Sequence, residues 1–328
     1  MTSRAQGDLS IDEALALAHR AISRAPRVVL ACHVNPDGDA LGSMLALHHV
    51  LRAAGIPSVA TFPSPFVVAP HYRDLPGLDL LTPPELVESD PPVLITFDSG
   101  SLSRLGDLET RAKAASELIV IDHHASNERY GSINVIDERA AASGVLVRRL
   151  VAELGLPLNR DAAVCLYAAL VCDTGRFQYE STTSAVFELA RELAAFDLPI
   201  ASLSRVLFEE HRFAYLKLAA DVLSRAELVA EKKFVWAKIT QADLLRHDVS
   251  FEEIEGLIDL VRRTREAEVA CVLKEASDGA WRVSLRSLGA VDVCKIAEHE
   301  GGGGHRFAAG FTSDDPAVAV IRRILDAL

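Results

Sequence analysis

The hydrophobic pattern in the first half of the chain repeats one unit: a short apolar run, a polar loop and a helical pattern. The run RVVLAC (27–32) leads into the loop HVNPDGDA (33–40), and LGSMLALHHVLRAAG (41–55) then has apolar residues at helical spacing. Four to eight consecutive apolar residues are typical of a strand that is buried on both faces. Strands alternating with helices therefore predict an α/β fold, a parallel sheet with helices on both faces.

Two more apolar runs end on polar residues in the same way. PPVLITFDSG (91–100) and ELIVIDHHAS (117–126) are predicted strands, and DAAVCLYAALVCDTGRF (161–177) is a predicted helix that ends near Asp173, with Gly175 as its stop. In parallel sheets ligands bind beyond the carboxyl ends of the strands. The polar residues expected at that edge are His33, Asn35, Asp37, Asp39, Asp98, Asp122, His123 and His124.

The last third of the chain has a different pattern. The segments 226–239, 267–276 and 280–289 are predicted antiparallel strands, with a helix at 251–264 between the first two. A glycine cluster, EGGGGHRFAAG (300–310), and a final helix follow. We expect a first domain at 1–190, a connector at 191–218 and a smaller α+β domain at 219–328, with a cleft between the two domains.

Composition limits the possible functions. With 328 residues and 49% hydrophobic residues, the chain is long enough for two cores. A formal charge of −12 argues against a surface for long nucleic acid, because such surfaces need many Lys and Arg residues. The polar first 20 residues do not resemble a signal peptide, and no apolar run is long enough for a membrane span, so a cytoplasmic location is expected. The five scattered cysteines predict reduced, mostly buried thiols.

The polar residues at the predicted sheet edge indicate a metal site. Taken singly, Asp37 and Asp39 also fit a turn and a helix cap, and Asp98 fits a loop. Taken together, oxygen and imidazole donors on four separate elements are enough for two divalent ions. Without a thiolate, manganese is the first choice, with magnesium, cobalt or zinc as alternatives. The candidate ligands are His33, Asp37, Asp39, Asp98, His123 and Asp173.

Five motifs give the chain a family resemblance. HVNPDGD, FDSG, IDHH and CDTG resemble, in order and spacing, the motifs of the DHH phosphoesterase superfamily, and GGGGHRFAAG with VSLRS resembles the DHHA1 C-terminal domain. Size and motifs are most similar to the bacterial nanoRNase and pAp phosphatase branch. Members of that branch hydrolyse very short oligonucleotides and 3'-phosphoadenosine 5'-phosphate. The resemblance therefore implies a phosphoesterase in which two metal ions activate water for attack on phosphorus.

The resemblance also implies a role for each motif residue. His33, Asp37 and Asp98 would hold one metal, Asp98 would bridge, and the other metal would be held by Asp39, Asp98, His123 and Asp173. Asp122 would orient a histidine, and His124 would face the substrate phosphate. In the C-terminal domain the substrate would be bound by Arg286, Ser287, Gly302, Gly303, Gly304 and His305, with a contribution from Arg306. Consecutive glycines suit this role because their backbone N–H groups can approach an anion closely.

Several functions remain open at this point. A RecJ-like exonuclease shares the catalytic motifs, but a basic channel would then be expected. A family II pyrophosphatase carries similar motifs without the GGGH segment. A nucleotide-binding sensor with an inactive site is the non-enzymatic alternative. Within the favoured class, cyclic-di-AMP and its linear product pApA stand beside nanoRNA and pAp as substrates. A homodimer is one assembly that the resemblance allows.

Overall fold

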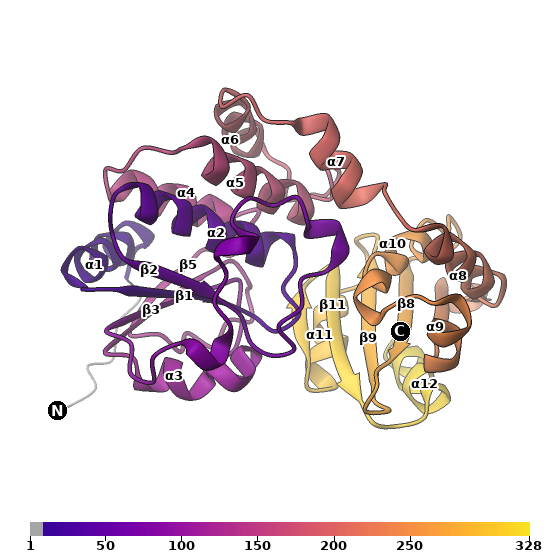
Figure 1. Ribbon diagram of the computed structural model, residues 1–328. Coiled ribbons are helices and arrows are strands. Elements are labelled where there is room, and N and C mark those ends of the chain that lie inside the picture. Colours follow the sequence, from indigo (N-terminus) through magenta and orange to yellow (C-terminus); the bar gives the residue numbers. More distant parts are fainter. Residues whose placement is uncertain (1–8) are drawn as a thin grey trace. The chain divides into compact units, whose positions relative to one another are not determined.

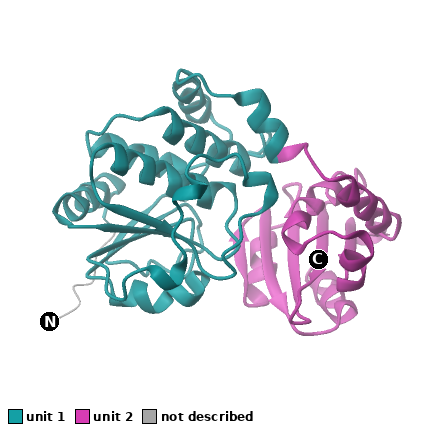
Figure 2. Ribbon diagram, in the orientation of Figure 1, with its two compact units in different colours: residues 1–207 teal, residues 208–328 magenta. Residues whose placement is uncertain are grey.

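The chain divides into two compact units, Met1–Leu207 and Phe208–Leu328 (Figure 2). The computed structural model describes residues 9–328. Residues 1–8 lie outside the described residues. They begin the predicted first domain and the segment that does not resemble a signal peptide. The predicted division into 1–190, 191–218 and 219–328 stays a prediction.

The described part of unit 1 is built on a five-stranded sheet, whose strands are β1 (Val28–Cys32), β2 (Ser58–Thr61), β3 (Val93–Phe97), β4 (Glu117–Asp122) and β5 (Ile133–Ile136). Its α-helices are α1 (Ile11–Arg24), α2 (Gly38–Ala53), α3 (Glu109–Ala114), α4 (Ser143–Glu153), α5 (Arg160–Asp173), α6 (Ser184–Ala194) and α7 (Ile200–Phe208). A 3-10 helix, η4 (Leu102–Leu108), precedes α3.

All neighbouring strands of this sheet are parallel, in the order β2-β1-β3-β4-β5. After β1 the chain moves outward to β2 and then returns to β3 on the other side of β1. The strand order therefore reverses between β1 and β3, and in open parallel sheets ligands bind beyond the carboxyl ends of the strands at such a point. One face of the sheet packs on η4 and α3, and α1, α2 and α4 cover the opposite face (Figure 1). The predicted parallel sheet with helices on both faces is confirmed.

Glycines let α2, α4 and α5 approach one another closely. A Cβ atom on Gly42 would overlap the carbonyl oxygen of Cys165, and one on Gly38 would overlap the Sγ atom of Cys172. On α4, a Cβ atom on Gly144 would lie 2.9 Å from that of Ala169. Because glycine has no side chain, the start of α2 can lie beside the end of α5. We call these three contacts the glycine seam.

Unit 2 contains a mixed sheet in the order β10-β11-β9-β8-β7-β6. Its strands are β6 (Glu227–Val229), β7 (Phe234–Ile239), β8 (Val269–Glu275), β9 (Trp281–Ser287), β10 (Gly303–His305) and β11 (Ala308–Ser313). Its α-helices are α8 (Phe213–Ser224), α9 (Gln241–His247), α10 (Leu257–Val261), α11 (Val293–His299) and α12 (Ala317–Ala327). Helices α8, α9 and α10 pack on one face of the sheet, and α11 and α12 pack on the other. The predicted α+β character of this unit is confirmed.

Three details of the second half differ from the prediction. Strands β7 and β8 are parallel, because α9 and α10 make a crossover connection between them. The segment 226–239 is a hairpin of β6 and β7 whose turn contains Lys233 at a φ of +48°. The predicted helix at 251–264 is a 3-10 helix, Phe251–Ile254, followed by the short α10.

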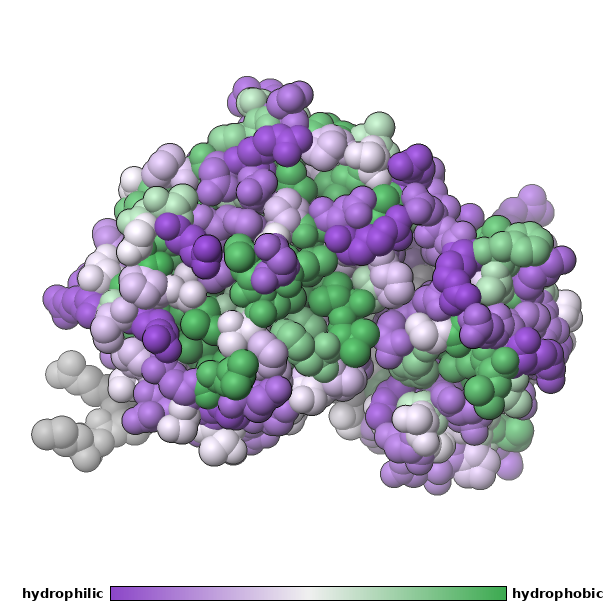
Figure 3. Space-filling view, viewed as in Figure 1, coloured by the Kyte–Doolittle hydropathy of each residue, from purple (hydrophilic) through white to green (hydrophobic). Residues whose placement is uncertain are grey.

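The cysteines are unpaired, and most of them are buried. All five cysteines are free thiols, and Cys32, Cys165 and Cys271 are buried. Across residues 9–328, no helix has both the length and the apolar character needed to cross a membrane. The face in Figure 3 is a mixture of hydrophilic residues and separate apolar patches, and the exposed apolar residues of the protein include Phe213 and Leu216 of α8.

Candidate metal centre and active site

The carboxyl edge of the unit 1 sheet brings the six candidate ligands together. His33 follows β1, Asp98 follows β3, and His123 follows β4. The donor atoms form two groups, within each of which all ligand atoms lie within 4.8 Å of one another. The first group is His33, Asp37 and Asp98, and the second is Asp39, His123 and Asp173.

Asp98 lies between the two groups. Its Oδ2 atom is 3.6 Å from Nε2 of His33, and its Oδ1 atom is 3.4 Å from Nε2 of His123. The carboxylate is 3% exposed, and its backbone has a φ of +53°, an uncommon value for a residue other than glycine. The N–H group of Asp98 donates to the carbonyl of Ile121, which ties this turn to β4. One carboxylate thus presents one oxygen to each group.

The two aspartates at the start of α2 combine structural and site contacts. Oδ1 of Asp37 accepts from the N–H groups of Asp39 and Ala40, so Asp37 is the N-cap of the helix. Its other oxygen lies 4.0 Å from Nε2 of His33. The helix-cap interpretation and the ligand interpretation of Asp37 are therefore compatible, because each uses a different oxygen.

Asp39 is buried at the contact between α2 and α4. Its Oδ1 accepts from the Ser43 hydroxyl at 2.8 Å and from the Gly144 N–H at 3.0 Å, and its Oδ2 accepts from the Ser143 N–H at 2.5 Å. Oδ2 also lies 3.6 Å from Nε2 of His123. Burial, followed by the charge of Asp98, raises the pKa of Asp39 well above its usual range. A carboxylate in this position is stabilised by a nearby cation.

Both candidate histidine ligands have a carbonyl oxygen beside Nδ1. Nδ1 of His123 is 2.9 Å from the carbonyl oxygen of Ala140, and Nδ1 of His33 is 2.8 Å from that of Val34. A carbonyl can only accept, so it favours the tautomer with the proton on Nδ1 and a lone pair on Nε2, although at His33 the guanidinium of Arg104, also 2.8 Å from Nδ1, favours the opposite tautomer. In both residues Nε2 is the atom that faces the carboxylates. The arrangement suits metal-binding imidazoles.

The residues fit divalent cations. Two ligand atoms bound at about 2.1 Å to one ion are separated by roughly 3.0–3.4 Å, depending on the coordination angle. The separations from Nε2 of His123 to Asp173, Asp98 and Asp39 are 3.0, 3.4 and 3.6 Å. Four aspartates and two histidines also supply the oxygen and nitrogen donors that manganese, magnesium or zinc accept. The site can hold metal ions, and the choice of metal stays a prediction.

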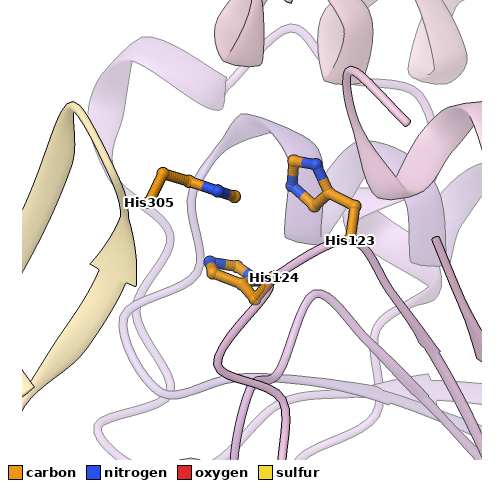
Figure 4. Close-up of side chains that lie close together, drawn as sticks. All are labelled: His123, His124 and His305. Carbon is orange, nitrogen blue, oxygen red and sulfur yellow. The ribbon is translucent and has the colours of Figure 1, made fainter. Parts of the chain in front are cut away.

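His124 and Asp122 form a separate hydrogen-bonded pair beside the ligands. Oδ1 of Asp122 accepts from Nδ1 of His124 at 2.7 Å and from the N–H of His123 at 2.8 Å, while Asn127 donates to Oδ2. Burial lowers the pKa of His124, but Asp122 and Asp98 together raise it, and the net pKa is raised. The two histidines follow β4 directly, and their rings are 5.2 Å apart (Figure 4). Asp122 is thus placed to orient His124.

In unit 2, Arg286 and His305 project from the same face of the sheet. Arg286 on β9 pairs with Ala308 on β11, and Ala308 pairs with His305 on β10. Directly paired residues of neighbouring antiparallel strands lie on one face. The small Ala308 therefore separates the two predicted substrate-binding side chains.

The other predicted substrate-binding residues have different surroundings. The Ser287 hydroxyl donates to Glu268 at 3.1 Å and accepts from the Gly289 N–H, so it already stabilises the turn after β9. The guanidinium of Arg306 lies 5.3 Å from the ring centre of Phe307. Among the glycines, Gly302 packs so closely on β11 that a Cβ atom would overlap the carbonyl oxygen of Gly310, and Gly304 has a φ of +139°. Gly303 pairs with Gly310 in the ladder. Their roles in substrate binding stay predictions.

Four residues near the site were not identified from the sequence: Ser43, Ser143, Arg104 and Asn127. Ser143 donates its hydroxyl to Asp98 at 3.1 Å and its N–H to Asp39. Arg104 contacts His33, and Asn127 contacts Asp122. Each of these polar residues lies in a loop or in a first or second helical turn, a common position for such residues, so nothing in the pattern separates them from ordinary caps and turns.

The parallel sheet, the Asp- and His-rich edge and the separate mixed sheet define a DHH protein with a DHHA1 domain, and the chain belongs to this family. The family model of the DHH N-terminal domain matches residues 27–170, and the model of the DHHA1 domain matches residues 231–328. The predicted family is confirmed.

Among curated relatives, the chain is similar to two proteins described as bifunctional oligoribonuclease and PAP phosphatase NrnA. It is 32% identical to the protein of Thermus thermophilus over 289 residues, which cover 87% of this chain and 83% of the relative. It is 28% identical to that of Bacillus subtilis over 297 residues, covering 89% of this chain and 90% of the relative. Among solved structures, an exopolyphosphatase-related protein from Bacteroides fragilis superposes with a TM-score of 0.86. That match has 22% identity, covers 96% of this chain and 95% of the other, and supports the fold.

Proposed function

We propose that this protein is a metal-dependent phosphoesterase that hydrolyses short oligonucleotides, such as nanoRNA and pApA, and 3'-phosphoadenosine 5'-phosphate. The observation that carries the proposal is the position of Asp98, with one oxygen facing His33 and the other facing His123. A carboxylate shared by two ligand groups is the arrangement that a pair of close metal ions requires. The two NrnA relatives, each aligned over most of both chains, support the choice of substrate class.

The proposed metals are two divalent ions, manganese first, with magnesium, cobalt or zinc as alternatives. His33, Asp37 and Asp98 would hold one ion, and Asp39, Asp98, His123 and Asp173 would hold the other. When bound, such ions supply an activated water and neutralise charge on the phosphoryl oxygens. The protein residues around them are fixed in place, since Asp39 and Asp98 both accept hydrogen bonds from Ser143 at the start of α4.

His124 has the proposed role of substrate contact. Its Nδ1–H donates to Asp122, and Nε2 is the ring nitrogen proposed to meet a phosphoryl oxygen. Asp122 in turn is held by Asn127, so the imidazole is oriented without any direct ligand role for Asp122. The pKa of His124 is raised, so the ring holds a proton more readily and can offer it to an anion.

The DHHA1 unit has the proposed role of recognising the nucleotide. Arg286 and His305 lie in one row on the same sheet face, and a planar guanidinium can donate two hydrogen bonds to a phosphate. Gly303 and Gly304 have no side chains, and their backbone is proposed to lie close to the phosphate or the terminal nucleotide. Ser287 is proposed to act mainly through the turn that it holds with Glu268. Long nucleic acid is not a proposed partner, because the chain has a formal charge of −12.

The test is a substrate panel with manganese and a matched inactive variant. The panel contains a dinucleotide, pApA, 3'-phosphoadenosine 5'-phosphate, cyclic-di-AMP and a single strand of about 40 nucleotides at physiological salt. We expect rapid hydrolysis of the short substrates, weak hydrolysis of the long strand, and no activity for Asp98→Asn. Equal degradation of the long strand would favour the RecJ-like alternative. Nucleotide binding without hydrolysis would favour the sensor.

A further inference from the structure

Arg104 lies beside the first ligand group and has a fixed backbone. It belongs to η4, in the segment that follows Asp98. Its carbonyl accepts from the N–H of Val34 at 2.9 Å, and its N–H donates to the carbonyl of Ser101 at 3.2 Å. The first hydrogen bond joins the segments that follow β1 and β3, and the second closes a turn within the segment after β3, so the side chain of Arg104 starts from a defined position at the edge of the site.

The guanidinium of Arg104 contacts a metal-ligand candidate and no acid. Its Nη2 atom is 2.8 Å from Nδ1 of His33. Among residues 9–328, no carboxylate lies within ion-pair distance of it, although the protein has 46 acidic residues. The residue is exposed. An accessible guanidinium with only an imidazole as side-chain partner, next to a phosphoesterase site, has donors left for an anion.

The two contacts of His33 Nδ1 exclude each other. A guanidinium only donates, so Arg104 needs a lone pair on Nδ1, whereas the Val34 carbonyl at 2.8 Å only accepts and needs a proton there. A metal ion on Nε2 requires the lone pair on that atom, so the proton of the neutral ring must be on Nδ1. With the proton on Nδ1, the ring donates a hydrogen bond to the Val34 carbonyl. The N–H groups of Arg104 then face an N–H group and have no lone pair to donate to.

We propose that Arg104 is a phosphate-binding residue of the DHH unit that rests on His33 until the metal site is filled. Metal binding on the His33 side removes the acceptor for Arg104, and the guanidinium becomes available to the phosphoryl oxygens of the substrate. The ligand class is a phosphate mono- or diester. This inference rests on the proposed function, which supplies the phosphate ester, and adds a binding residue and an order of binding to it.

The experiment compares Arg104→Ala, Arg104→Lys and the control Arg20→Ala with the unchanged protein. Arg20 is an exposed residue of α1, so its removal changes the net charge by the same amount away from the ligands. Calorimetry first measures manganese affinity of the metal-free protein without phosphate. It then measures the affinity of the manganese-loaded protein for inorganic phosphate. Circular dichroism checks that each variant is folded.

We expect Arg104→Ala to bind manganese at least as tightly as the unchanged protein, because the competing acceptor bond to His33 is gone. Its phosphate affinity should fall about ten- to a hundredfold, the usual range for losing a hydrogen bond between charged groups. Arg104→Lys should recover part of that loss, since it keeps the charge without the planar fork. Arg20→Ala should match the unchanged protein in both measurements.

Two results would overturn the inference. If Arg104→Ala loses manganese and phosphate affinity in equal proportion, the residue only positions His33. If the phosphate affinity of Arg104→Ala equals that of the parent protein, Arg104 does not bind phosphate. The same holds if the manganese-loaded parent protein binds no phosphate. Hydrolysis of the nucleotide panel is a separate measurement. An Arg104-dependent phosphate affinity in a protein that hydrolyses none of the panel would contradict the proposed function and leave this inference standing.

Discussion

The hydroxyl of Ser143 offers a direct test of how the site holds its ligands. Ser143 is fully buried, and its Oγ atom donates to Oδ1 of Asp98 at 3.1 Å. Its N–H donates to Asp39. Ser143→Ala removes the first hydrogen bond and keeps the second, and it adds no atoms to the packed start of α4. The change therefore acts on Asp98 alone.

The magnitude follows from the charge of the acceptor. A hydrogen bond to a charged group contributes about 1.5–3 kcal/mol, which corresponds to about ten- to a hundredfold in an equilibrium constant. Within the described residues, Ser143 is the one hydroxyl donor to Asp98. Without it, the carboxylate is less firmly oriented between the two ligand groups, and manganese affinity should fall by about that factor.

Ser43→Ala is the matched control. Its hydroxyl is also fully buried and also donates to an aspartate of the site, Asp39, at 2.8 Å. Asp39 keeps the N–H donors of Ser143 and Gly144 and so stays oriented, and manganese affinity should therefore fall less than for Ser143→Ala.

Titration calorimetry with manganese on chelator-treated protein measures both variants, and circular dichroism confirms that they are folded. Equal losses for the two variants, or a larger loss for Ser43→Ala, would show that Asp98 is not held in the way described.

Three further predictions test the site and its support. Asp98→Asn should abolish turnover and release manganese while the fold survives, as measured by metal analysis and circular dichroism; a fully active, metal-loaded variant would refute the shared-ligand assignment. Arg286→Ala and His305→Ala should each lower kcat/KM for a dinucleotide about ten- to a hundredfold but affect a small chromogenic phosphodiester much less, and equal losses would contradict a recognition role. Gly42→Ala should lower the melting temperature, because overpacking costs about 1–3 kcal/mol, whereas Gly256→Ala, with open space around its Cβ position, should not.

The sequence predicted the unit 1 sheet correctly, and the physical reason also applies to the edge at which the candidate ligands lie. Buried parallel strands have continuous apolar runs, and all their carboxyl ends meet at one edge. Asp98 and His123 could thus be expected at the same edge without knowledge of the side-chain geometry. Asp173 could be expected there as well, because the helix pattern ends beside Gly175, which has a φ of +54° in the structure.

Other features depend on long-range contacts that no local pattern reports. Strands β7 and β8 were expected to be antiparallel with a helix at 251–264 between them, but α9 and α10 together form a crossover that makes them parallel. Ser143 contacts Asp39, 104 residues earlier in the chain, and Arg104 contacts His33, 71 residues earlier. Such contacts are made only when the sheet has formed, so their residues look like ordinary loop and helix-start residues in the sequence.

The glycine seam has a consequence for protein engineering. Asp39 and Asp173 stand at the start of α2 and the end of α5, and they share a histidine only because Gly38 and Gly42 let these helices come so close. The ligand motifs alone would therefore not form the same site in another protein. A designer who copied them onto another parallel sheet, with alanines or larger residues along the helix contact, would reproduce every ligand and still place two of them too far apart. A transplanted centre of this kind has to include the helix pair as well as the sheet edge.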